Sequence, residues 1–71
     1  MLVKTEAGNY VNLLGSHVVT IEGSRGNEVT IIPMKGRTRH LIQCFSDREM
    51  AQELMDRIAA DFAEGRRLFA A

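Results

Sequence analysis

The sequence contains one cysteine, one proline and no tryptophan, and only 6% of its residues are aromatic. The single cysteine, Cys44, excludes an internal disulfide and any zinc site built from several cysteines. A chain of 71 residues buries only about 60% of its unfolded surface, so its core needs a further source of stability. We expect that source to be self-association, in a homodimer. A lone free thiol is typical of a reducing compartment, which predicts a cytoplasmic location.

An excess of charge of one sign is also missing. Nine basic and nine acidic residues give a formal net charge of zero, which argues against a general polyanion binder. No apolar run approaches the roughly 20 residues of a membrane span. The N-terminus lacks the basic and apolar regions of a secretory signal. We therefore expect one domain over residues 1–71, with no membrane partner.

Catalytic motifs are absent as well. The sequence has no phosphate-binding loop, no G-x-S-x-G, no H-E-x-x-H and no dinucleotide fingerprint. His40 and Cys44 fall on one predicted strand and stand roughly 13 Å apart, too far for a shared metal or a nucleophile pair. His17 reaches either of them only across the sheet. We predict a protein that is not an enzyme and that has no cofactor.

One helix is strongly predicted, over residues 47–64. Ser46 and Glu49 form a capping box, and Gly65 suits the left-handed position after a helix. Apolar residues recur at helical spacing and form one stripe toward a core. The stripe consists of Met50, Leu54, Ile58 and Phe62, flanked by Ala51, Met55 and Ala59.

Five short β-prone segments precede the helix, separated by turn signals rich in glycine and asparagine. They cover residues 2–5, 10–14, 17–23, 27–34 and 38–45. Even spacing and short links favour an antiparallel meander. The predicted fold is α+β: four to five antiparallel strands with the C-terminal helix across one face. The inward strand residues are Leu13, Val19, Ile21, Val29, Ile31, Leu41 and Phe45.

The other face of this sheet is not cleanly polar, and one helix covers only one face. A second copy covering that face is a further argument for a homodimer. Three placements stay open for the apolar residues after Gly65: folding back on the sheet, contacting a partner subunit, or extending the helix. The candidate subunit contacts are Val18, Ile32, Ile42, Leu68 and Phe69.

A small basic cluster lies near the Lys35–Gly36 turn. Lys35, Arg37 and Arg39 are candidates for contacting an anionic ligand or a nucleic acid. The simpler interpretation is a solvated turn whose charges protect a sheet edge. With one tyrosine and no tryptophan, a base-stacking platform would rest on Tyr10.

Two resemblances extend this reading. The runs NYVNL, HVVTIEG, NEVTIIPMKGR and FSDREMAQELMDRI resemble small bacterial and phage proteins built as a β-meander plus one C-terminal helix. The stretch VVTIEGSRGNEVTIIPMKGR is similar to the first half of LytTR-type DNA-binding domains. Those domains make DNA contacts with further strands after the helix, and this chain ends at Ala71, so the resemblance transfers no site residue.

The sequence thus predicts a small accessory or protein-interaction module, homodimeric and non-enzymatic. The alternative function is a nucleic-acid-binding regulator that uses the Lys35–Arg39 turn.

Overall fold

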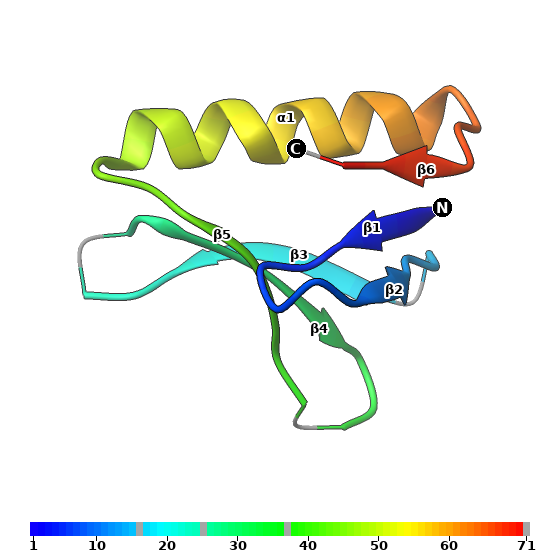
Figure 1. Ribbon diagram of the computed structural model, residues 1–71, viewed down its shortest axis with the longest axis horizontal. Helices are drawn as coiled ribbons and strands as arrows, with labels where there is room; N and C mark the ends of the chain where they lie inside the picture. Colours follow the sequence, from blue (N-terminus) through cyan, green and yellow to red (C-terminus); the bar gives the residue numbers. More distant parts are fainter. Residues whose placement is uncertain (16, 25, 37, 71) are drawn as a thin grey trace.

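The computed structural model describes residues 1–15, 17–24, 26–36 and 38–70. Its elements follow the predicted order, with one strand added after the helix (Figure 1). They are β1 (Leu2–Lys4), β2 (Tyr10–Asn12), β3 (His17–Glu22), β4 (Glu28–Pro33), β5 (His40–Cys44), α1 (Arg48–Ala63) and β6 (Leu68–Phe69). The α+β class, the antiparallel meander and the helix are confirmed.

The strands form two sheets instead of a single meander. One sheet is the antiparallel meander β3-β4-β5. The other, which we call the small sheet, has the order β2-β1-β6: β1 is antiparallel to β2 and parallel to β6. A Leu2 N–H bond of 2.8 Å to the Arg67 carbonyl supports the parallel pair.

In the meander, β3 and β4 are paired as the alternation predicts. Val19 lies opposite Ile31 and Ile21 lies opposite Val29. Val29 and Ile31 are fully buried, and Val19 and Ile21 pack partly buried against the same core. This side of the meander faces α1, which contacts both strands.

A β-bulge in β5 changes the predicted faces of that strand. Val29 pairs with Gln43 but Thr30 pairs with Leu41, so Ile42 is an additional residue on β5. The prediction that Leu41 faces the core is wrong, because Leu41 lies opposite Thr30, between the inward positions of β4. Ile42, expected on the outer side, is 4% exposed and belongs to the core.

The N-cap of α1 is Asp47 and not Ser46. The Met50 N–H donates to Asp47 Oδ1 at 2.9 Å, and Asp47 has extended backbone angles. Both residue types are good N-caps. The carboxylate also carries a charge that complements the positive end of the helix dipole, which favours Asp47 over its neighbour.

At its other end α1 closes as predicted, through a left-handed Gly65 with φ of +77°. The Gly65 N–H donates to the Phe62 carbonyl and the Arg66 N–H donates to the Asp61 carbonyl, both at 3.1 Å. This is the Schellman pattern. Arg66 also pairs with the Asp61 side chain at 3.4 Å. The turn sends the chain back toward the sheets, so Leu68 and Phe69 do not extend the helix.

The small sheet closes one side of the space between α1 and the meander. Figure 1 shows β6 directly beside α1, with β1 and β2 below it. Its inward residues include Val3 and Phe69, which are buried. The Glu6 N–H donates to the Leu41 carbonyl at 3.0 Å, which attaches the β1–β2 turn to β5. The buried core consists of Val3, Leu13, Val29, Ile31, Ile42, Ala51, Leu54, Ile58 and Phe69.

The helix presents a narrower stripe to this core than predicted. Ala51, Leu54 and Ile58 are buried, whereas Met50 and Phe62 are exposed. In the part of the chain that the structure describes, no helix is both long and apolar enough to cross a membrane.

Candidate functional site

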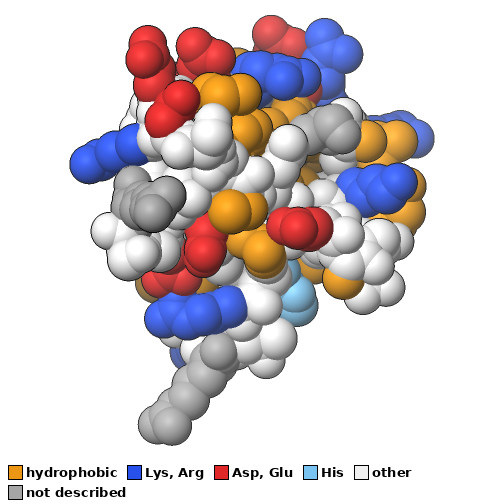
Figure 2. Space-filling view, turned by 60° about the vertical axis from the view of Figure 1, so that its left-hand side comes forward, with side chains coloured by type: hydrophobic (Ala, Val, Ile, Leu, Met, Phe, Trp, Pro, Cys, Tyr) orange, Lys and Arg blue, Asp and Glu red, His pale blue; other side chains and the backbone are white. Residues whose placement is uncertain are grey.

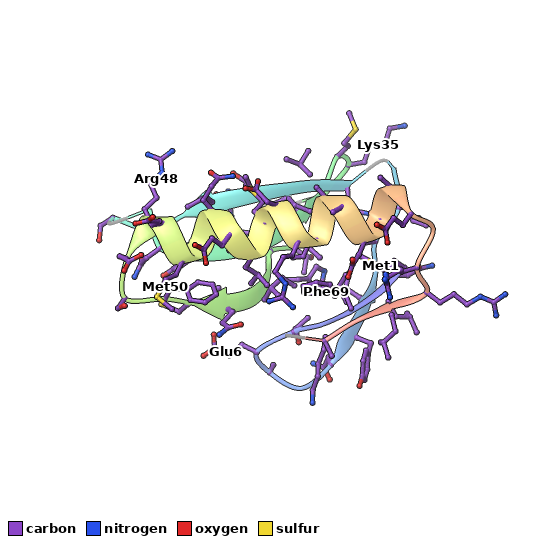
Figure 3. All side chains as sticks on the ribbon, turned by 90° about the horizontal axis from the view of Figure 1, so that it is seen from above. Met1, Glu6, Lys35, Arg48, Met50 and Phe69 are labelled. Carbon is purple, nitrogen blue, oxygen red and sulfur yellow. The ribbon has the colours of Figure 1, made fainter. Side chains whose placement is uncertain are left out.

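The predicted basic cluster is only partly assembled. Lys35 is exposed and projects away from the body of the molecule (Figure 3). Arg39 forms an ion pair with Glu22, at the end of β3, so its charge is partly neutralised within the chain. Arg37 lies outside the described residues. The described cations of this cluster are thus one free lysine and one paired arginine.

The histidines and the cysteine are ordinary strand residues. His40 and Cys44 lie at the two ends of β5, and His17 begins β3 on the far side of β4. The Asn27 amide lies 3.7 Å from the exposed Cys44 sulfur. Across residues 1–15, 17–24, 26–36 and 38–70, no group of three or more His, Cys, Asp or Glu side chains is placed to hold a metal ion.

The predicted subunit contacts divide into two groups. Val18 is 48% exposed and lies opposite the half-buried Ile32 on the meander face away from α1. Leu68 is exposed on the outer face of the small sheet. Ile42 and Phe69 instead belong to the core of the chain itself, so their burial needs no second subunit.

A shallow apolar depression lies on the side of the molecule where α1 overhangs β3. We call it the β3 groove. Its volume is about 380 Å³, and its walls come from α1, β3 and the chain between β2 and β3. Its lining residues include His17, Val19, Met55, Asp56, Ala59 and Phe62.

The groove exists because only one side of the helix–sheet sandwich is closed. Seen from above, the small sheet and β3 lie on opposite sides of α1 (Figure 3). The small sheet covers the β5 side, where Phe69 is buried. On the β3 side Phe62 remains 40% exposed and Val19 is only partly buried. Apolar side chains of the core layer thus reach solvent along β3.

The polar side chains of the groove are held by their own chain. The Leu14 N–H donates to His17 Nδ1 at 3.0 Å, and the His17 N–H donates to the Leu14 carbonyl at 3.0 Å. The Gln52 amide donates to Asp56 Oδ1 at 2.9 Å. His17 and Asp56 therefore each have a local partner and do not form an acid–base pair with each other.

The free edge of β3 borders this groove, which His17 and Val19 of that strand line. Among the described strands, β3 has β4 as its one neighbour. It is also six residues long, as long as any strand of the fold. An unprotected strand edge presents unpaired N–H and C=O groups that another strand can bind.

Met55, Ala59 and Phe62 were expected in the buried stripe, not at a surface site. A clue was present in the width of that stripe. At about 100° per residue, the apolar positions from Met50 to Phe62 span about 180° of the helix, more than the roughly 100° that one sheet face covers. The part of the stripe that the sheet leaves uncovered includes the flank with Met55, Ala59 and Phe62, which lines the β3 groove.

A second apolar surface lies on the outer face of the small sheet, where Leu2, Tyr10 and Leu68 are exposed beside Lys4 and Asn12. These strands have only two or three residues each, so they offer a short edge to a partner.

No family model, curated protein sequence or solved structure matches this chain.

Proposed function

We propose that this protein is a non-enzymatic protein-interaction module that works as a homodimer. The observation that carries the proposal is the β3 groove, where an apolar depression lies directly beside a free strand edge. Apolar surface and unpaired backbone groups together favour binding of another polypeptide over binding of a small polar substrate.

The polar groups of the groove support a binding role. General acid–base catalysis needs a group directed at the substrate, within hydrogen-bond reach of the proton that it moves. His17 Nδ1 is occupied by the Leu14 N–H, and Asp56 is occupied by Gln52. What the groove offers to a ligand is mainly apolar contact from Val19, Met55 and Phe62.

The size of the chain supports self-association as the form of that binding. The core is small, and the groove leaves Met55 and Phe62 partly in water. Burying apolar surface contributes about 25 cal/mol per Å², so covering the groove stabilises a chain whose own core is marginal. Homodimers with a two-fold axis are the commonest soluble oligomers.

The alternative, a nucleic-acid-binding regulator, has weaker support. The Arg39 charge is paired with Glu22, and at the top of the molecule, over α1, acidic side chains are interspersed with Lys and Arg instead of leaving a basic face (Figure 2). Salt-sensitive binding of DNA or RNA that weakens in Arg39→Ala and Arg37→Ala chains would favour this alternative.

The homodimer is tested by sedimentation equilibrium with a matched pair of variants. Ala59 and Ala60 are neighbouring exposed alanines of α1, and only Ala59 lines the groove. We expect the wild-type chain and Ala60→Arg to be dimers at high micromolar concentration, and Ala59→Arg to be a monomer with unchanged helical circular dichroism. A wild-type chain that stays monomeric would overturn the proposal.

A further inference from the structure

We infer that the second copy binds through β3 itself, in antiparallel pairing, so that two meanders join into one continuous sheet with Thr20 beside Thr20 of the partner chain at the two-fold axis. This inference rests on the proposed homodimer and specifies its geometry. The two α1 helices then lie on the same face of the joined sheet and cover each other's β3 groove.

The first argument is which backbone groups of β3 are free. His17 lies opposite Pro33, which has no N–H, and the His17 N–H bonds Leu14 instead of β4. His17 and Pro33 are therefore a non-hydrogen-bonded pair. Because hydrogen-bonded and non-hydrogen-bonded pairs alternate along antiparallel strands, the N–H and C=O groups of Val19 and Ile21 point away from β4.

An independent hydrogen bond on the other side of β4 supports this assignment of the hydrogen-bonded and non-hydrogen-bonded pairs. The Phe45 N–H donates to the Asn27 carbonyl at 2.9 Å. Odd-numbered residues of β4 therefore bond toward β5, and even-numbered ones, such as Thr30, bond toward Thr20 of β3. Two observations, one on each side of β4, thus indicate that the N–H and C=O groups of Val19 and Ile21 point away from β4.

The free groups select one register. In a hydrogen-bonded antiparallel pair, two residues exchange both of their N–H···O bonds. Pairing Val19 with Ile21 of the partner chain uses every one of these groups and gives about four backbone bonds across the axis. Centring the pair on Val19 would require the His17 N–H, which Leu14 already holds. Centring it on Ile21 would pair Val19 with Gly23, beyond the end of β3.

This register also decides where the helices go. Val19 and Ile21 both face α1, and directly opposed residues of an antiparallel pair project to the same side of the sheet. Both helices therefore lie on one side. α1 contacts both β3 and β4, so we place its axis over the boundary between these two strands.

Strand spacing then fixes the distance between the helices. With strands about 4.8 Å apart, the boundary between β3 and β4 lies about 4.8 Å from the two-fold axis, and the two helix axes lie about 10 Å apart. Helices pack at about 8–10 Å. The flank that meets its copy is lined by Met55, Ala59 and Phe62. Thus the sheet pairing brings the exposed apolar flanks into contact without further rearrangement.

The test is disulfide cross-linking in a Cys44→Ser background, which removes the exposed native thiol. In the proposed register Thr20 is a non-hydrogen-bonded pair with its own copy, with Cα atoms about 4.5 Å apart, within the range that a disulfide spans. Thr20→Cys should cross-link to a covalent dimer on oxidation with copper phenanthroline. Val18→Cys, on the same face, is the matched control, because its two thiols lie roughly 13 Å apart.

A mixed experiment tests the register without altering Thr20. Val18 lies opposite Glu22 of the partner chain, so a mixture of Val18→Cys and Glu22→Cys chains should give the heterodimer, and neither variant alone should cross-link. A wild-type dimer by sedimentation that fails both cross-links would overturn this geometry and leave the homodimer standing. A wild-type monomer would overturn both.

Discussion

The guanidinium carbon of Arg57 lies 5.5 Å from the centroid of the Phe69 ring. Arg57 is an exposed residue of α1, whereas Phe69 is 3% exposed and lies beside the helix in β6 (Figure 3). The guanidinium therefore lies over the ring in a cation–π contact. This contact attaches a strand of two residues, too short to be stable by its backbone bonds alone, to the helix.

Phe69→Ala is expected to lower the free energy of unfolding by about 3–5 kcal/mol, because it leaves a cavity between α1 and the small sheet. Arg57→Ala is expected to cost about 0.5–1 kcal/mol, the size of an exposed cation–π contact. Urea unfolding followed by circular dichroism measures both. Leu68→Ala, on the exposed face of β6, is the control and should change stability by about 0.5 kcal/mol or less. Equal losses of stability in Leu68→Ala and Phe69→Ala would contradict a structure in which Phe69 is buried and Leu68 is exposed.

Asp47→Ala is expected to lower stability by about 1 kcal/mol, because the Met50 N–H loses its capping acceptor. Ser46→Ala should have an effect of about 0.5 kcal/mol or less, since within the described residues the Ser46 hydroxyl donates to the Met50 sulfur, at 3.8 Å, and not to a backbone group of the helix. Thermal unfolding of the two variants side by side distinguishes them. A larger loss for Ser46→Ala would restore the capping box that the sequence suggests.

Gly65→Ala is expected to cost about 1–2 kcal/mol, since an L-residue at φ of +77° is held in the left-handed region. In the described part of the chain nothing lies within 4 Å of the place that a Cβ of residue 65 would take, so the loss comes from the backbone and not from a clash. Gly65→Asn should lose less, because asparagine tolerates this conformation better than alanine. Chemical denaturation at one fixed protein concentration gives the comparison, and equal losses for the two variants would argue against this backbone cause.

The unfolding midpoint should rise with protein concentration if the chain is a homodimer. A hundredfold increase should add about 2.7 kcal/mol of apparent stability per dimer by mass action. Urea titrations at two concentrations measure this shift. The Ala59→Arg chain, which loses the groove contact, should show the same midpoint at both concentrations. A concentration-independent midpoint for the wild-type chain would contradict a homodimer at those concentrations.

The sequence predicts the helix and the strand positions closely, because these depend on local periodicity and turn residues. It does not predict the β5 faces, because the bulge at Ile42 depends on how β5 fits β4. It also places the N-cap one residue too early, at Ser46 instead of Asp47, since both residue types satisfy the same rule. The sequence does not predict β6 either, because a segment of two residues is too short to show an alternating pattern. Leu68 and Phe69 form a strand because they pair with Leu2 and Val3.

The candidate site is harder still to predict from sequence. The pattern identifies an apolar helix stripe but not which part of it the sheet covers. That depends on the small sheet closing the β5 side and leaving the β3 side open. The residues named as subunit contacts from the sequence that are at the surface or half-buried are Val18, Ile32 and Leu68. The residues of α1 that line the β3 groove, Met55, Ala59 and Phe62, were not among them.

The parallel pairing of β1 with β6 also governs the order in which this fold can form. Val3 is fully buried between neighbours that include Phe69, its partner in the register. The meander and α1 can form from contacts close in sequence, but β1 reaches its native environment only after residues 68 and 69 have been synthesised. Contacts between distant parts of a chain form slowly, because a long loop must close first. The small sheet should therefore be the late step of folding, with Val3 exposed to other chains until β6 arrives.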